Sequence, residues 1–285
     1  MCWFYIEKQL EELTLEIDEF WTRGNLKERI LEALDKSGLN KNNLNIEDLH
    51  PIDQYHARGI AATKDLAEKI NIKENQIIID VGCGLAGPAR YFANKFKCNV
   101  VGVDITPAFI EIGNDFNKRT NMNDKVTLKV SDGNTLPFDD AKFDAAISQH
   151  VTMNIKNRER FFSEIYRVLK NDTFFAFSEH GLGPKGNPVF PLPWADNEEM
   201  SFLIKPDQTM QLLKKIGFKN ISFLETGKKY MEGYEKSIKA KDSSKKPILG
   251  MHVIGGPTMF ERQKNSMISI KEKRTLPFEV ICFKN

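Results

Sequence analysis

Two aspartates end successive apolar runs in the first half of the chain, where a carboxylate could contact a bound nucleoside. Asp80 follows the β-branched run 77–79, and Asp104 follows the run 100–103. A pyrophosphate bound beside Asp80 would gain nothing from the negative charge, whereas an amino-acid ammonium group would be stabilised there. Asp104 is placed to accept hydrogen bonds from both hydroxyls of a ribose. The two residues therefore favour a ligand that carries both a ribose and a positive charge.

A glycine-rich turn joins the first of these runs to the next predicted helix. Gly82, Gly84 and Gly87 follow Asp80, with Cys83 between the first two glycines. Glycines permit a close ligand approach that a Cβ atom would block, and the free N–H groups of a helix N-terminus form an electropositive rim. The spacing alone also describes dinucleotide-binding proteins and, less often, a structural turn. It predicts a nucleotide-binding turn without identifying the nucleotide.

Alternating strands and helices are predicted around these residues. Residues 125–131 alternate as a third strand that runs into Asp132, Gly133 and Asn134, and residues 145–148 form a fourth, apolar strand. In open α/β sheets, ligands bind in the crevice outside the carboxyl ends of the strands. The residues that follow each strand are therefore expected to lie around one crevice.

The order of these motifs resembles that of the class I S-adenosylmethionine-dependent methyltransferases. The set comprises an acid before the glycine turn, an acid after strand two, Asp-Gly after strand three and the motif Leu-Pro-Phe-x-x-x-x-Phe-Asp at 136–144. The resemblance covers roughly residues 50–225. Segments 53–59 and 149–154 are similar to those of a subgroup related to the glycine, sarcosine and ubiquinone-pathway methyltransferases. One departure is Ala86, where many of those enzymes have glycine.

The resemblance implies a Rossmann-like α/β fold with a seven-stranded, mainly parallel sheet, helices on both faces and an antiparallel last strand. Residues 1–49 are expected to form an N-terminal helical extension and linker, and residues 50–285 the methyltransferase domain. A helix is expected to open at Asp53. Insertions at about 181–201 and 228–275 could form walls of the substrate site. The N-terminal helices are expected to pack on the main domain or on a second subunit of a homodimer, or to cover the substrate.

The cofactor implied by the resemblance is S-adenosyl-L-methionine, with S-adenosyl-L-homocysteine as its product. Tyr55 would face the sulfonium, since aromatic faces attract cations, and Arg58 would bind the methionine carboxylate. Ile105 would pack on the adenine, and Asp132 would accept a hydrogen bond from the adenine amine or stabilise its own turn. The expected cofactor-binding residues are Tyr55, His56, Arg58, Gly59, Asp80, Gly82, Cys83, Gly84, Gly87, Asp104, Ile105, Asp132, Gly133, Asn134 and Gln149.

His150 is the candidate catalytic residue, because it lies just past strand four. It would orient or deprotonate the methyl acceptor, and it could equally well cap a helix or bond to the core. The methyl carbon of a sulfonium is already electrophilic, so a strong base is not obligatory. If His150 is a base, the rate should rise with pH through a pKa near 6.5, the ordinary value for histidine.

The expected activity is methyl transfer to a small-molecule acceptor, with an amine or amino acid as the leading class. A quinone-type or sterol-like acceptor, methylated on carbon or oxygen, is the alternative. An NAD-dependent oxidoreductase fits the glycines and Asp104, but Asp80 and Asp132 argue against it. The alternative of a non-catalytic protein that binds the cofactor stays open, because methyl transfer requires few specific side chains.

Composition limits the partners. Forty-one basic and 39 acidic residues give a net charge of +2, so no basic excess indicates nucleic acid. The four cysteines, at 2, 83, 98 and 282, lack the paired spacing of a zinc site and are expected to be reduced thiols of a cytoplasmic protein, with no metal. Since no apolar run reaches about 20 residues, stable membrane insertion is not expected.

Overall fold

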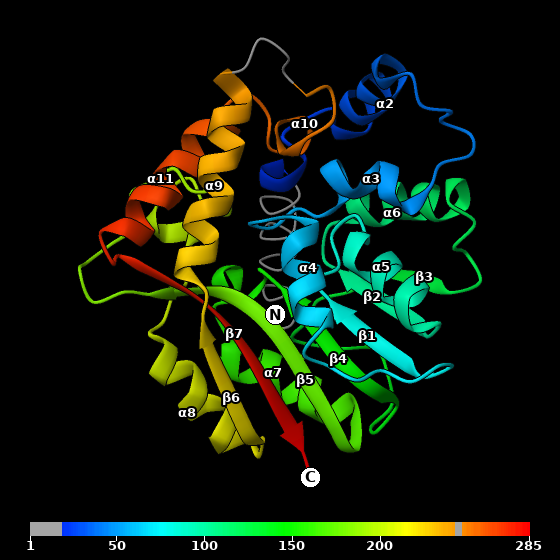
Figure 1. Ribbon diagram of the computed structural model, residues 1–285. Coiled ribbons are helices and arrows are strands. Elements are labelled where there is room, and N and C mark those ends of the chain that lie inside the picture. The colour runs from blue at the N-terminus through cyan, green and yellow to red at the C-terminus, as the bar shows by residue number, and fades with distance from the viewer. Residues whose placement is uncertain (1–18, 243–246) are drawn as a thin grey trace, which may run out of the picture.

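A seven-stranded sheet forms the centre of the computed structural model, which describes residues 19–242 and 247–285 (Figure 1). Its strand order is β3-β2-β1-β4-β5-β7-β6. The strands are β1 Ile77–Val81, β2 Asn99–Asp104, β3 Val126–Val130, β4 Phe143–Gln149, β5 Leu169–Leu182, β6 Lys219–Glu225 and β7 Thr275–Lys284. Strands β1 to β5 pair in parallel, and β7 runs antiparallel to both β5 and β6. The expected sheet and its antiparallel last strand are confirmed.

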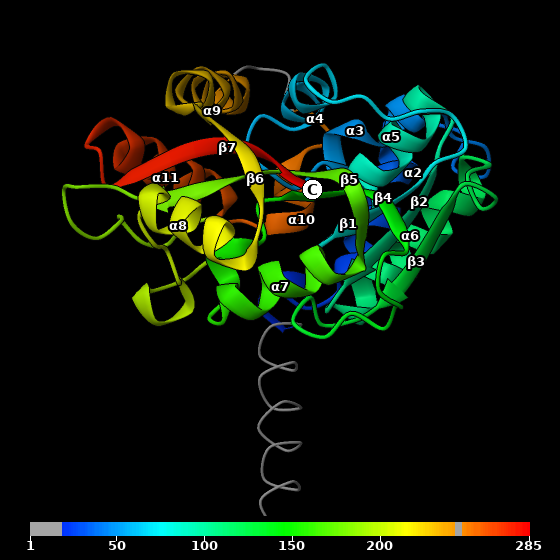
Figure 2. The same cartoon turned by 90° about the horizontal axis from the view of Figure 1, so that it is seen from below.

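Helices cover both faces of the sheet (Figure 2). They are α2 Leu26–Ser37, α3 Ile46–Asp53, α4 Ile60–Ala67, α5 Gly87–Phe96, α6 Pro107–Arg119, α7 Arg158–Val168, α8 Pro206–Ile216, α9 Gly227–Asp242, α10 Met251–Gly255 and α11 Met259–Lys271. On one face, α4 and α5 contribute Leu66 and Phe92 to an apolar cluster with Ile78 and Ile147. On the other face, α7 packs Phe161 and Phe162 against β5 and β7. Burial of these side chains fixes the sheet between two helical layers.

The switch point of the sheet lies at β1. Strand β2 pairs with one side of β1 and β4 with the other, so Asp80 is aligned with Gly102 and Ile147. The connections from β1 to β2 and from β4 to β5 then leave on different sides, which opens a crevice at the carboxyl ends. Asp80 and Asp104 both occupy this edge.

The segment before α4 departs from the sequence prediction. The expected linker ends early, because α3 begins at Ile46 with a capping box in which the Asp48 side chain accepts from the Asn45 backbone. The helix expected to open at Asp53 begins instead at Ile60. Arg58 and Gly59 both have positive φ, at 68° and 52°, and this conformation interrupts a right-handed helix. Residues 54–59 are therefore an irregular segment free to line a site.

The described part of the N-terminal region shares a core with the main domain, whereas residues 1–18 of the expected helical extension lie outside the described residues. An apolar cluster joins Leu34, Leu49, Leu85, Phe116 and Ile254, which lie on or beside α2, α3, α5, α6 and α10. The Arg29 guanidinium donates hydrogen bonds to the carbonyls of Thr22, Arg23, Val253 and Ile254. One partly buried arginine thus ties the chain before α2 to the insertion between β6 and β7.

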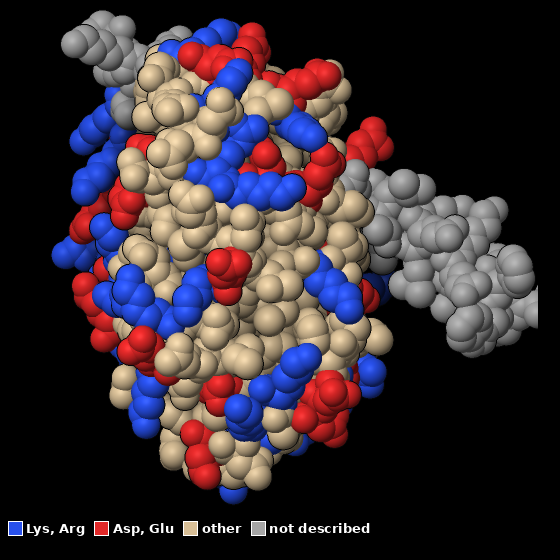
Figure 3. Space-filling view, turned by 90° about the vertical axis from the view of Figure 1, so that its right-hand side faces the viewer, with Lys and Arg blue, Asp and Glu red and all other residues tan. Residues whose placement is uncertain are grey.

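Charged residues of both signs are mixed on the face shown in Figure 3, where α2, α5 and α6 lie. This face shows no continuous basic stripe of the kind that tracks nucleic-acid phosphates. Within the described residues, no helix combines the length and hydropathy that a membrane crossing requires.

Candidate functional site

Asp80 is a buried carboxylate at the end of β1. It is 2% exposed, and its Oδ2 atom has no hydrogen-bond partner among the described residues. Burial, followed by the nearby charge of Asp104, raises the pKa of Asp80 to about 8. A buried carboxylate is costly unless it is paired, so this position suits a cationic ligand group.

Asp104 is held in a fixed orientation at the end of β2. Its Oδ2 accepts a hydrogen bond from the Gly84 backbone N–H at 2.8 Å, and its Oδ1 accepts from the Thr106 N–H at 2.9 Å. Burial raises the pKa of Asp104, and the two backbone hydrogen bonds oppose that shift. Each carboxylate oxygen retains a further acceptor site, as a ribose diol requires.

The turn between β1 and α5 depends on glycine at two positions with positive φ. At Gly82, with φ of 78°, a Cβ atom would lie 2.2 Å from a methyl group of Val151. At Gly84, with φ of 52°, no atom lies within 4 Å of the position a Cβ would take. The space over Gly84 is thus open to a ligand. Ala86, the departure from the resemblance, adopts φ of 61° in the left-handed region, at a cost of roughly 1–2 kcal/mol.

Asp132 forms the turn after β3. Its Oδ1 accepts hydrogen bonds from the Asn134 backbone N–H at 2.8 Å and from the Asn134 side-chain amide at 3.0 Å. Gly133 is closely packed, because a Cβ there would lie 2.6 Å from the Phe161 ring. The turn-stabilising role named as the alternative for Asp132 is therefore present, and contacts of these residues and Ile105 with adenine stay a prediction.

The Thr63 hydroxyl of α4 connects the segment 54–59 to the end of β4. Its Oγ1 atom lies 2.7 Å from Gln54 Oε1, 3.1 Å from Gln149 Oε1 and 3.2 Å from His56 Nε2. Burial lowers the pKa of His56 to about 4, so its imidazole is neutral at pH 7. His56 and Gln149, two expected site residues far apart in sequence, thus share one polar cluster.

His150 contacts a tyrosine from the insertion before the last strand. Its Nε2 lies 2.6 Å from the Tyr230 hydroxyl, and the two rings stack with centroids 5.5 Å apart. Its φ is 61°, and its backbone N–H donates to the Ser178 carbonyl at 2.8 Å. Burial, then the neighbouring His180 and His56, lowers the pKa of His150 well below its ordinary value. The expectation of a pKa near 6.5 is therefore wrong for this site.

Three histidine rings lie in series at this edge of the sheet. His56 stacks on His150 at 5.7 Å between centroids, and His180 meets His150 edge to face at 5.3 Å. His180 is fully buried, and both of its ring nitrogens lack hydrogen-bond partners in the described part of the chain. Among the residues that the structure describes, no group of histidine, cysteine, aspartate or glutamate could hold a metal ion.

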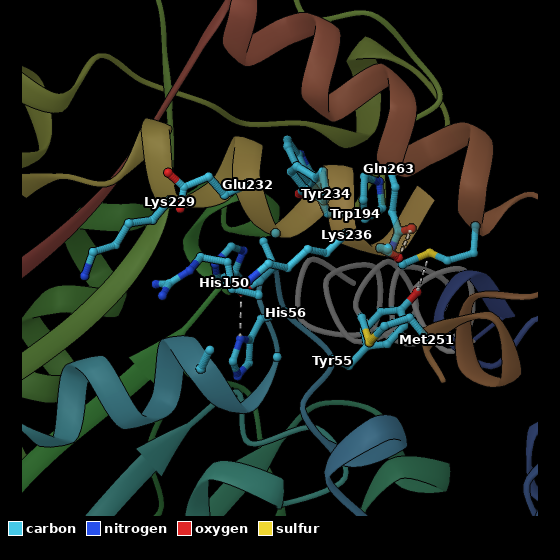
Figure 4. A pocket seen from close by; sticks show the side chains of 18 of the residues that line it. Tyr55, His56, His150, Trp194, Lys229, Glu232, Tyr234, Lys236, Met251 and Gln263 are labelled. Atoms are coloured by element: carbon cyan, nitrogen blue, oxygen red, sulfur yellow. Dashed lines mark hydrogen bonds between the residues drawn. The ribbon is translucent and has the colours of Figure 1, made fainter. Parts of the chain in front are cut away.

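A cavity of about 360 Å³ opens beside His150 (Figure 4). Its walls come from residues 55–59, from the loop that carries Trp194, and from α9 and α11, with Trp21 contributed by the N-terminal region. The predicted site residues that line it are Tyr55, His56, Arg58, Gly59 and His150. The described lining does not include Asp80 or Asp104. The candidate site therefore has two parts, the carboxylate edge of the sheet and an adjoining cavity.

Tyr55 and Arg58 already have contacts within the protein. The Tyr55 hydroxyl donates to the Met259 sulfur at 3.9 Å, and burial raises its pKa to about 12. Arg58 Nη2 donates to Asp65 at 2.8 Å, whereas its buried Nη1 has no partner in the described residues. Arg58 is therefore half satisfied and could still bind an anion.

Sequence reasoning did not pair His150 with Tyr230 and assigned no role to His180 or Trp21. These contacts join residues up to 80 positions apart, across an insertion whose path is not encoded in a local motif. Tyr230, Tyr234, His252 and Met259 were the signals that the insertion could close the substrate side, and none of them identified His150 as a partner.

Comparison with known proteins agrees with the geometry. Residues 79–177 match the family described as a methyltransferase domain. The sterol 24-C-methyltransferase of Kluyveromyces lactis is 34% identical over 126 residues, which cover 44% of this chain and 34% of that protein. The chain spans between 26% and 39% of the length of the first curated relatives that it matches.

Solved structures share the fold over most of the chain. Phosphoethanolamine N-methyltransferase 2 of Haemonchus contortus, in complex with S-adenosyl-L-methionine, has a TM-score of 0.71 at 19% identity and covers 89% of this chain and 59% of its own. Geranyl diphosphate C-methyltransferase of Streptomyces coelicolor, in complex with S-adenosyl-L-homocysteine, also has a TM-score of 0.71, at 16% identity. The match covers 95% of this chain and 98% of that protein. The chain thus has the Rossmann-like fold of the class I methyltransferases.

Proposed function

We propose that this chain, whose residues 79–177 match the methyltransferase domain family, transfers the methyl group of S-adenosyl-L-methionine to a small molecule and leaves S-adenosyl-L-homocysteine. The observation that carries the proposal is the buried carboxylate of Asp80, whose Oδ2 has no hydrogen-bond partner among the described residues, beside the fixed carboxylate of Asp104. Asp80 would bind the ammonium group, and Asp104 the ribose hydroxyls. The open space over Gly84 would admit the nucleoside.

The remaining cofactor residues belong to the same proposal. Asp132, Gly133, Asn134 and Ile105 would surround the adenine. Tyr55, His56, Gly59 and Gln149 would lie at the methionine end, where Arg58 is a candidate for the carboxylate. Gly82, Gly87 and Cys83 would shape the turn under the ligand.

His150 is proposed as the catalytic residue because it lines the cavity and is neutral at physiological pH. The bound cofactor supplies a methyl group that is already electrophilic, so the protein has to align the acceptor and exclude water. A neutral imidazole can accept the proton that the acceptor loses on methylation. Tyr230, at 2.6 Å from Nε2, would hold the ring so that the other nitrogen serves the acceptor.

The acceptor is proposed to be an amine or amino acid, with a carbon or oxygen acceptor of quinone or sterol type as the alternative. Relatives support both, since the phosphoethanolamine N-methyltransferase 1 of Arabidopsis thaliana and the sterol enzyme of Kluyveromyces lactis match this chain at 30% and 34% identity. A cytoplasmic location is part of the proposal and is supported by three buried free cysteines, Cys83, Cys98 and Cys282. A homodimer is also part of the proposal, and size-exclusion chromatography would test it.

Turnover tests the proposed function. The protein, incubated with methyl-labelled S-adenosyl-L-methionine and a cell extract, is expected to place label on a small molecule, which gains the mass of one labelled methyl group less that of the hydrogen it replaces. His150→Ala in the same extract should label at most about one hundredth as fast, the usual scale of general acid–base help. Cofactor binding without label on any small molecule would indicate a non-catalytic binder.

A further inference from the structure

We propose that the methyl acceptor is an apolar, elongated molecule that carries one carboxylate, and that Arg58, Lys229 and Lys236 bind this carboxylate. Arg58, named above as a candidate for the cofactor carboxylate, is assigned here to the acceptor instead. The inference rests on the methyl transfer proposed above and specifies the acceptor for that site. It is carried by the division of the cavity into a charged end and an apolar end.

Three basic side chains line one part of the cavity. Arg58 lies deepest, with its side chain 11% exposed and Nη1 buried without a partner among the described residues. Lys229, on α9, donates to Asp65 at 2.6 Å, and Asp65 also accepts from Arg58. Lys236, two turns further along α9, has no hydrogen-bond or ion-pair partner in the described part of the chain. Donors therefore remain for an anion.

The balance of charge favours a single negative group. Arg58, Lys229 and Lys236 face two acids, Glu232 in the lining and Asp65 behind it, so one positive charge is unmatched. A carboxylate neutralises this charge, whereas a phosphate at pH 7 would exceed it. An arginine with a free Nη and adjacent lysines suits a carboxylate.

The other end of the cavity is lined mainly by aromatic rings and methionines, and the Gln263 side chain on that side already accepts a hydrogen bond from the Ser237 hydroxyl at 2.8 Å. Tyr55 packs edge to face on Trp21 with centroids 5.7 Å apart, and its hydroxyl is already bonded to Met259. Figure 4 shows Lys229 and Glu232 at one end and Tyr55 and Met251 at the other, with His150 on the charged side and Trp194 between. These side chains offer contact area for an apolar body and few groups that could bind a polar one.

The cavity is large for a simple amino acid. Its volume of about 360 Å³ lies in the range that typically encloses a drug-sized ligand, and it does not include the carboxylate edge assigned to the cofactor. Glycine or sarcosine would leave the apolar end unfilled. The acceptor atom would lie beside His150, with the carboxylate at the basic side chains and the body toward Tyr55.

Calorimetry on protein saturated with S-adenosyl-L-homocysteine tests the inference without knowledge of the natural acceptor. The probes are 3-phenylpropionate, its neutral amide, 3-phenylpropylamine, acetate and 2-phenylethyl phosphate. We expect 3-phenylpropionate to bind at least about tenfold more tightly than each of the other four, because only it combines a single negative charge with an apolar body. Lys236→Gln and Arg58→Gln should each bring acid and amide affinities to within about twofold. Lys228→Gln, an exposed lysine of α9 outside the cavity, should leave the preference intact.

Several outcomes would overturn the inference. Equal binding of the acid and the amide, or no binding of either, would show that the cavity has no carboxylate site. Tighter binding of the amine would show that the cavity binds a cation. Tighter binding of the phosphate would reject a single charge, and acetate equal to 3-phenylpropionate would reject the apolar body. If Arg58→Gln loses affinity for S-adenosyl-L-homocysteine and keeps the preference for acid over amide, Arg58 serves the cofactor instead. Failure of the wild-type protein to bind S-adenosyl-L-homocysteine would contradict the proposed function itself.

Discussion

At the scale of single residues, the proposed role of Asp80 would link cofactor binding to stability. Its pKa in the folded protein is about 8, above the ordinary 3.8, so between these values the folded state retains a proton that the unfolded chain has lost. Stability of the unliganded protein therefore falls as pH rises through this window. We expect Asp80→Asn, which cannot ionise, to raise the melting temperature of the unliganded protein at pH 8.5 and to change it little at pH 4.

The same substitution should weaken the binding of S-adenosyl-L-homocysteine at least tenfold, because it removes the charge proposed to stabilise the ammonium group of the ligand. Scanning calorimetry and titration on one preparation measure both effects. Asp124→Asn, at an exposed acid, is the control and should change neither. A destabilised Asp80→Asn with unchanged affinity would show that Asp80 is structural.

His150 and Tyr230 permit a second prediction at this scale. Because the pKa of His150 lies well below its ordinary value, turnover should be independent of pH through 6.5 and fall only in more acidic solution. Tyr230→Phe should lower kcat about tenfold or more with little change in affinity for S-adenosyl-L-homocysteine, since it removes the hydroxyl that positions the ring. Tyr91→Phe, on α5 and outside the cavity lining, should have no effect. A rate that rises through pH 6.5 would show that His150 is not buried during turnover.

At the scale of elements, regular strands and helix starts were predictable because their signals are local. The predicted fourth strand lies within β4, Phe143–Gln149, and α6 begins at Pro107, where proline fits the first helical turn. The segment 54–59 was not predictable, because its helical pattern is broken by backbone conformations at Arg58 and Gly59 that depend on tertiary contacts. That irregular segment turns Tyr55 and Arg58 toward the cavity.

The walls of the cavity are the other part that the sequence left open. Helix α9 brings Tyr230 to His150 and Lys229 to Asp65, and α11 brings Met259 to Tyr55. Each contact joins residues separated by 80 to 204 positions, and pairing at such distances is decided by packing instead of local propensity. The insertion was recognisable as a wall of the site, but its contacts were not.

At the scale of the whole molecule, the sheet follows from the order of its motifs. Acidic residues at the ends of β1 and β2 and a turn after β3 come together because parallel strands share one carboxyl edge. The proposed cofactor half of the site is therefore encoded by short motifs, which the sequence displays. The acceptor half is built from the N-terminal region, a loop and the insertion, so its chemistry emerges only from their assembly.

The most direct test of the central claim is a calorimetric comparison of S-adenosyl-L-methionine, S-adenosyl-L-homocysteine and NAD on the full chain at pH 7.5. We predict micromolar dissociation constants for the first two, equivalent to about 8 kcal/mol, and at least hundredfold weaker binding of NAD. Asp104→Ala should weaken the binding of both S-adenosyl ligands at least tenfold, because two charge-assisted hydrogen bonds to the ribose are lost. The fold should stay intact. Tighter binding of NAD, or S-adenosyl affinity unchanged in Asp104→Ala, would contradict the account.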